Sequence, residues 1–168
     1  MTIAIVMGVS GCGKSTIAAG LARQDGWSLL EGDAFHPAAN VAKMKAGIPL
    51  TDEDRWPWLR AIAARTDELR AVGTSAAVAC SALKRAYRDI LIGGRPDTLL
   101  VYARGSQSLI AERMASRKNH FMPPALLDSQ FATLEEPGSE ERAIVVDIAM
   151  TAEEAIRQAI EKIQRYVS

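Results

Sequence analysis

Short apolar runs alternate along the chain with longer stretches that have the hydrophobic periodicity of helices. Five apolar runs have the length and composition of buried strands, namely Ile3 to Met7, Ser28 to Glu31, Ala76 to Cys80, Thr98 to Tyr102 and Ile144 to Asp147. Such alternation is typical of βαβ units, in which crossover helices connect parallel strands. The pattern therefore predicts an α/β fold with a five-stranded parallel sheet and helices on both faces.

Two of the predicted helices have ends that the sequence marks. One begins near Thr51, where a side-chain oxygen and three acidic residues suit a helix N-terminus, and Gly73 is placed to end it. The last helix begins with a capping box formed by Thr151 and Glu154. The expected buried faces are Leu59, Ile62, Thr66 and Leu69 in the first helix, and Ile156, Ile160, Ile163 and Val167 in the last. We interpret both helices as scaffold.

Length and charge limit the class of protein. A chain of 168 residues has room for one domain with a single core, here residues 1–168. Lys plus Arg and Asp plus Glu number 20 each, so the net charge is zero, which argues against nucleic acid or an anionic membrane as the main partner. The charge is nevertheless polarised: residues 84–118 have eight basic and three acidic residues (+5), and residues 128–161 have two basic and nine acidic (−7).

The cysteines and the N-terminus favour a cytoplasmic protein. Cys12 and Cys80 are the only cysteines, and neither stands in a CxxC or Cys/His metal-binding spacing. The apolar residues from Met1 to Met7 are too few, and lack the basic residues, for a signal peptide. No apolar run approaches the length of a membrane span.

The strongest motif is a glycine-rich loop between the first strand and a helical run that opens at Thr16. Its residues Gly8, Val9, Ser10, Gly11, Cys12, Gly13, Lys14 and Ser15 match G-x-x-x-x-G-K-[ST] in full. In such a P-loop the backbone N–H groups bind phosphates, Lys14 reaches the β- and γ-phosphates, and the Ser15 hydroxyl binds Mg²⁺. We therefore predict a nucleoside triphosphate site over residues 8–16, and we assign no chemistry to the Cys12 thiol.

A candidate catalytic carboxylate, Asp33, follows the second strand. Ligands of open α/β sheets bind at the carboxyl ends of the strands, so Asp33 is placed to face the γ-phosphate. There it would accept a proton from an acceptor hydroxyl or hold a magnesium-bound water. The alternative is an ordinary Asx turn beside Gly32. The DxxG and NKxD motifs of GTPases are absent, and the third strand lacks a carboxylate at its end.

Further blocks of sequence resemble those of a known family. They are Gly8 to Ser15, Gly32 to Pro37, Gly47 to Leu59, Cys80 to Asp89, Arg117 to Phe121 and Gln130 to Pro137, together with Asn40, Lys43 and Met44. In this order and spacing the blocks resemble the thermoresistant-type gluconate kinases over nearly the whole chain. The resemblance implies a nucleoside-monophosphate-kinase-like fold, a homodimer, and phosphorylation of the 6-hydroxyl of D-gluconate with ATP and Mg²⁺.

That resemblance implies an acceptor segment over about residues 33–60. D-Gluconate has a carboxylate and several hydroxyls, so its site needs a positive charge and hydrogen-bonding partners. Residues of these types are Asp33, His36, Arg55, Lys84, Arg85, Arg88 and His120. Arg55 is the first choice for the carboxylate, because a guanidinium pairs with it in two parallel bonds; alternatively it is an exposed residue paired with a neighbouring Asp. The alternative for each histidine is a solvent-facing ring.

A basic segment from Arg117 to Pro124 has no strand or helix periodicity, and we interpret it as a lid over about residues 115–125. Arg113 and Arg117 lie one helical turn apart as the chain enters it. The resemblance implies that one arginine, here Arg113, stacks on adenine and that the other, Arg117, closes on the transferred phosphoryl group. A solvated arginine face is the alternative.

Two other functions stay open at this point. One is a P-loop kinase for a different small acid, such as shikimate or adenylylsulfate; the long segment from Ala38 to Trp58 argues against it only through the resemblance. The other is a nucleotide-binding regulatory or motor-type ATPase, although no Walker B strand is visible.

Overall fold

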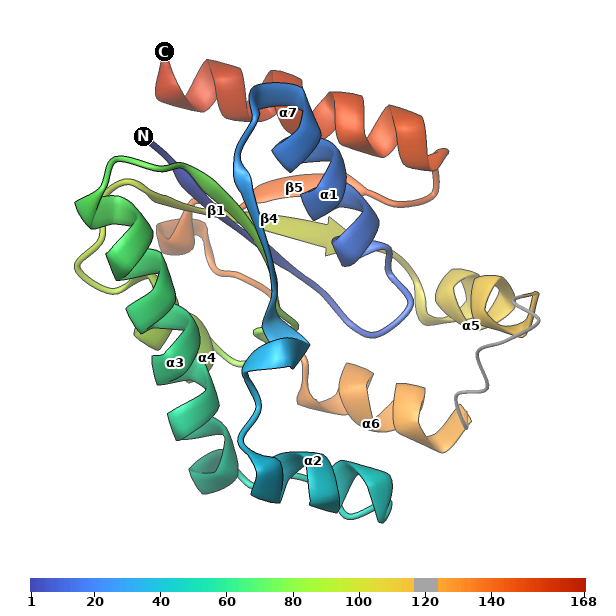
Figure 1. Ribbon diagram of the computed structural model, residues 1–168. Helices are drawn as coiled ribbons and strands as arrows, with labels where there is room; N and C mark the ends of the chain where they lie inside the picture. The colour runs from blue at the N-terminus through green and yellow to red at the C-terminus, as the bar shows by residue number, and fades with distance from the viewer. Residues whose placement is uncertain (117–123) are drawn as a thin grey trace.

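A parallel five-stranded sheet forms the centre of the computed structural model, which describes residues 1–116 and 124–168 (Figure 1). Its strands are β1 (Ile3–Met7), β2 (Ser28–Glu31), β3 (Ala76–Ala79), β4 (Thr98–Arg104) and β5 (Ile144–Asp147). Their order in the sheet is β2-β3-β1-β4-β5, and every pairing is parallel. The α/β fold predicted from the apolar runs is confirmed.

Helices cover both faces of this sheet. The helices of the fold are α1 (Lys14–Asp25), α2 (Ala38–Lys45), α3 (Asp52–Ala71), α4 (Arg85–Ile92), α5 (Gln107–Ala115), α6 (Pro124–Thr133) and α7 (Ala152–Val167), with short 3₁₀ turns η1 (Gly32–Phe35) and η2 (Ser139–Glu141). Helices α1 and α7 lie on one face, and α3 and α4 lie on the other (Figure 1). In the described part of the chain, no helix is long and apolar enough to cross a bilayer.

The core is divided into two layers by strand β1, all of whose residues are buried. Because successive side chains of a strand point to opposite faces, Ala4 and Val6 pack in the layer under α1 and α7. Ile3, Ile5 and Met7 pack in the layer under α3 and α4. Burial on both sides explains why the strand is uninterruptedly apolar.

Helix α3 begins and ends as the sequence predicts. The Thr51 hydroxyl accepts from the Asp54 N–H at 3.1 Å, and the Asp54 carboxylate accepts from the Thr51 N–H at 2.9 Å, which completes a capping box. The predicted face of Leu59, Ile62, Thr66 and Leu69 is buried. Gly73, with φ +71°, follows the helix in the left-handed region that favours glycine.

The buried face predicted for α7 is partly wrong. The capping box of Thr151 and Glu154 is present, but the buried residues are Ala155, Ala159 and Ile163. Val167 is 56% exposed. The helix is turned by about one residue from the predicted face, because small alanines let it pack closely on the sheet and on α1, which presents Gly20 to Ile156.

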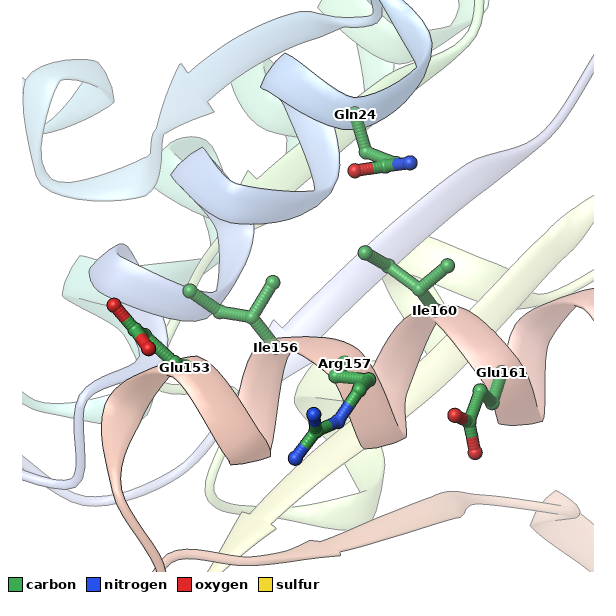
Figure 2. Close-up of a pocket in the computed structure, with 6 residues that line it drawn as sticks. All are labelled: Gln24, Glu153, Ile156, Arg157, Ile160 and Glu161. Carbon is green, nitrogen blue, oxygen red and sulfur yellow. The ribbon is translucent and has the colours of Figure 1, made fainter.

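This close packing of α1 on α7 yields a prediction. Alanine at a helix-interior glycine normally stabilises by about 1 kcal/mol. At Gly20, however, a Cβ would lie 2.7 Å from three side-chain carbons of Ile156, which projects from α7 toward α1 (Figure 2). We expect Gly20→Ala to lower the free energy of unfolding by about 1–3 kcal/mol, measured by urea denaturation.

The matched control is the same substitution in an Ile156→Ala background, where the atoms that clash are absent. There Gly20→Ala should be neutral or stabilising. An equal loss of stability in both backgrounds would contradict the packing explanation.

Candidate active site

The glycine-rich loop connects the end of β1 to the start of α1. Gly13 occupies the N-cap of α1 with φ +88°, a left-handed conformation that other residues adopt only at a cost. Gly13 has no side chain with which to cap the helix, so the first N–H groups of α1 are available to a phosphate. The predicted P-loop thus has the geometry of an anion site.

Two contacts from distant segments hold this loop. The Gly8 N–H donates to the Ser81 carbonyl at 3.2 Å, which joins the ends of β1 and β3. The Gln130 side chain, on α6, accepts from the Ser10 N–H at 2.6 Å and donates to the Ser10 hydroxyl at 2.8 Å. We did not predict a role for Gln130; its only signal was its place in a block that resembles a family.

The end of β2 also reaches the P-loop, although β3 lies between β2 and β1. The Ser15 hydroxyl donates to the Glu31 carboxylate at 3.0 Å, a contact that the sequence did not predict. Asp33 follows two residues later in η1, with an exposed side chain. Within the two described ranges, no three His, Cys, Asp or Glu side chains form a metal-binding group. Ser15 and these carboxylates are oxygen donors of the kind that Mg²⁺ prefers.

A cavity of about 310 Å³ adjoins the P-loop. Its lining residues are Gly11, Cys12, Gly13, Thr16, Ile17, Arg113, Ile148, Met150, Thr151, Ala152 and Ala155. Arg113 reaches it from α5 and donates to the Met150 carbonyl at 3.3 Å. The structure therefore brings Arg113 and Thr16, both predicted to bind nucleotide, to one cavity beside the phosphate loop.

Cys12 is buried within the loop. Burial raises the pKa of the Cys12 thiol above its usual value, although the charge of Lys14 acts in the opposite direction. The thiol is therefore protonated at neutral pH and is a poor nucleophile, which agrees with the prediction that it takes no part in chemistry.

The turn that carries Asp33 is fixed by a tryptophan and a histidine. The Trp58 indole N–H donates to the Gly32 carbonyl at 2.8 Å, and the His36 ring stacks on Trp58 with centroids 4.2 Å apart. The Asn40 amide donates to His36 Nδ1 at 3.2 Å, so the proton of the neutral ring lies on Nε2. Burial lowers the pKa of His36. His36 is half-buried, and its ring is held by the stack on Trp58 and the hydrogen bond from Asn40, so it is not a freely solvated side chain.

Arg55 and Lys84 lie close to one aromatic ring. The Arg55 guanidinium carbon is 5.6 Å from the Tyr87 ring centroid, and the Lys84 ammonium is 5.7 Å from it. The Asp52 carboxylate accepts from the Tyr87 hydroxyl and from Lys84, and these two bonds hold the pKa of Asp52 below its usual value. Arg55 forms no ion pair with a described residue; it donates to the Leu50 carbonyl at 2.6 Å. The positive charges of Arg55 and Lys84 exceed the negative charge of Asp52 by one, so this cluster has a net positive charge.

Arg85 and Arg88 do not have the surroundings that the sequence predicted for them. Arg85 is exposed and pairs with Asp89 and Glu140, so its charge is already neutralised. Arg88 was expected to contact the acceptor, and this is wrong. Its side chain is 1% exposed and is bonded to Glu141, because the first turn of α4 directs it into the protein interior. The predicted positions Arg117 and His120, and most of the proposed lid, lie outside the described residues.

A second hollow, of about 350 Å³, lies between α1 and α7 (Figure 2). It is lined by Gln24, Glu153, Ile156, Arg157, Ile160 and Glu161. None of these six residues was predicted to bind a ligand, and the hollow lies in the outer helical layer, away from the strand ends that carry the P-loop. We therefore place the candidate active site at the P-loop.

Comparison with known proteins gives one consistent result. A family model described as an AAA domain matches residues 3–166. A gluconokinase of Gluconobacter oxydans is 50% identical over 142 residues (84% of this chain, 80% of the relative), and the thermoresistant gluconokinase of Escherichia coli is 40% identical over 164 residues (97% and 94%). The crystal structure of a gluconokinase from Sinorhizobium meliloti superposes with a TM-score of 0.90 at 46% identity (98% and 93%).

The contact between Gln130 and the P-loop yields a prediction. Gln130→Leu removes two hydrogen bonds to Ser10, so we expect the loop to bind ATP about tenfold more weakly, as measured by titration calorimetry. Gln24→Leu, on the exposed face of α1, is the control and should leave the affinity near that of the wild type. Equal affinities for the wild type and Gln130→Leu would show that α6 does not organise the loop.

Proposed function

The chain belongs to the gluconokinase family, and we propose that it transfers the γ-phosphoryl group of ATP to the 6-hydroxyl of D-gluconate through the residues described above. The observation that carries this assignment of residues is the link between two anion-binding sites. The P-loop suits phosphates, the Arg55–Lys84 cluster suits a carboxylate, and the Gly8–Ser81 hydrogen bond joins the P-loop to the segment that carries Lys84.

ATP fits the P-loop side of this site. The cavity of about 310 Å³ takes the adenine beside Arg113, which can stack on the base. The N–H groups of residues 8–16 and the Lys14 ammonium bind the phosphates. Mg²⁺ would be held by the Ser15 hydroxyl and the phosphates, and when bound it neutralises phosphate charge. Because Ser15 donates to Glu31, the loop already presents this hydroxyl toward carboxylate oxygens.

D-Gluconate fits between η1 and the cluster around Tyr87. Its carboxylate pairs with Arg55 and Lys84, whose charges exceed that of Asp52 by one. His36 Nε2–H donates to a substrate hydroxyl, since its Nδ1 is already bonded to Asn40. This arrangement directs the end of the substrate remote from the carboxylate toward Asp33.

The transfer then needs few protein groups. The 6-hydroxyl oxygen forms a bond to the γ-phosphorus, its proton passes to the Asp33 carboxylate, and the bond between the γ-phosphorus and the ADP oxygen breaks. Lys14 stabilises the charge that develops on the phosphoryl oxygens. The roles assigned to Arg117 and His120 stay predictions. A homodimer located in the cytoplasm completes the proposal, on the family resemblance alone.

The substrate assignment is tested by an acceptor panel with coupled detection of ADP. With Mg-ATP, we expect D-gluconate to give the highest kcat/KM, well above shikimate and adenylylsulfate, and little ADP without an acceptor. A preferred acceptor other than gluconate would contradict the assignment. ADP release that does not depend on any acceptor would indicate a regulatory ATPase instead.

The role of Asp33 is tested by Asp33→Asn, which keeps the size of the side chain but cannot accept the proton. We expect kcat to fall by about 100-fold or more, with the ATP affinity near that of the wild type. Glu53→Gln, an exposed carboxylate on α3, is the control and should keep its activity. Equal losses of turnover and ATP affinity in Asp33→Asn would point to a structural role.

A further inference from the structure

Ala82 has an unfavourable backbone conformation in a functional part of the fold. It has φ +45° although it is not glycine, and it is completely buried. An alanine in this left-handed region carries strain that the surrounding structure must overcome, and such strain concentrates at functional sites. Ala82 belongs to the turn of residues 81–84, which connects β3 to α4 at the carboxyl edge of the sheet.

The buried Arg88 side chain holds this turn in place. Its Nη1 donates to two consecutive carbonyls, those of Ala82 at 3.0 Å and Leu83 at 3.1 Å. Its Nε and Nη2 donate to the two carboxylate oxygens of Glu141 at 2.6 and 3.0 Å. Glu141 in turn accepts from the Gly138 N–H at 2.9 Å. The guanidinium therefore ties the 81–84 turn to η2, and a lysine could not form all four bonds.

Both ends of the 81–84 turn contact groups of the candidate active site. At its start, the Ser81 carbonyl accepts from the Gly8 N–H of the P-loop. At its end, the Lys84 ammonium lies beside Tyr87 and 3.2 Å from Asp52. The backbone conformation at Ala82 thus sets the position of Lys84 relative to the P-loop.

We propose that Arg88 is a positioning residue for the kinase reaction: it holds Ala82 in the left-handed conformation and so places Lys84 for the carboxylate of the acceptor. Arg88 itself touches no substrate, since its side chain is 1% exposed. The proposal rests on the proposed function for the identity of the acceptor. The strained turn and its clamp stand on their own geometry.

The test uses Arg88→Lys, which keeps the charge opposite Glu141 but loses bonds to the turn. The chain offers a control in Arg95, which forms a similar set of hydrogen bonds at a more exposed position. Arg95 also donates to both oxygens of one carboxylate, Asp67 at 2.8 Å, and to two carbonyls, Ile90 at 3.0 Å and Gly93 at 3.4 Å. Because it precedes β4, Arg95 lies at the opposite edge of the sheet from the P-loop.

We expect Arg88→Lys to lower kcat/KM for gluconate about tenfold, mainly by raising the KM for gluconate. The affinity for ATP should change little, because Gln130 also holds the P-loop. Arg95→Lys should keep kcat/KM near that of the wild type and should lower the melting temperature by less, because its ion pair with Asp67 is more exposed. Equal kcat/KM values for the two variants would overturn the proposal, because the effect of Arg88 would then be stability alone.

Adding Ala82→Gly gives a readout that general destabilisation would not produce. Glycine adopts the left-handed conformation without the strain of alanine, so Arg88→Lys/Ala82→Gly should regain several-fold in kcat/KM over Arg88→Lys. In the wild-type protein, where Arg88 is present, Ala82→Gly alone should change kcat/KM by less. No recovery in the double variant would overturn the proposal.

Failure of this inference can be told apart from failure of the proposed function. A wild-type protein that does not phosphorylate gluconate would refute the function. In that case, crystal structures of the wild type and Arg88→Lys still test the clamp, because φ at Ala82 should leave the left-handed region only in the variant. An unchanged turn in Arg88→Lys would overturn the inference whatever the acceptor.

Discussion

The buried ion pair between Arg88 and Glu141 joins the two oppositely charged segments of this chain. Arg88 belongs to the basic segment of residues 84–118, and Glu141 belongs to the acidic segment of residues 128–161. Arg85 and Glu140 pair beside them. Leaving one member of a buried pair without its partner typically costs about 3–5 kcal/mol, so the two segments are strongly constrained to meet here. Opposite charges from the two segments therefore meet at this point of the fold.

The sequence was informative about the fold wherever an element has its own local signal. Strand β1 is apolar throughout because both of its faces are buried, and α3 is bounded by the Thr51 cap and Gly73. The strand order could not be predicted, because an apolar run does not indicate which strands lie beside it. The end of β4 was also missed: it extends to Arg104, where the ladder continues with Asp147 of β5. Pairing with a distant strand decides that boundary.

In the candidate site, too, the residues with a local sequence motif could be predicted, and those that depend on distant contacts could not. The P-loop is local and matches a pattern with a known mechanism, so its residues could be named from the sequence. Gln130 and Glu31 could not, because each acts through a tertiary contact with a P-loop residue, across 120 positions for Ser10 and Gln130 and across 16 for Ser15 and Glu31. Arg88 was misjudged for a related reason: its residue type suits an anion, and only burial shows that it binds backbone carbonyls instead.

The central position of β1 has a consequence for how the protein folds. Ile3 pairs with Ala76 and Thr98, so the first strand gains one neighbour only when almost half of the chain has been synthesised, and the other after more than half. Such long-range pairing slows folding, because distant segments must be brought together before they gain stabilising contacts. The cavity proposed to hold the nucleotide also includes residues up to Ala155. A ribosome-bound fragment that ends before α7 therefore has the whole P-loop sequence but only part of this cavity. On the proposed function, the complete cavity can bind nucleotide and stabilise the protein only once synthesis is almost complete.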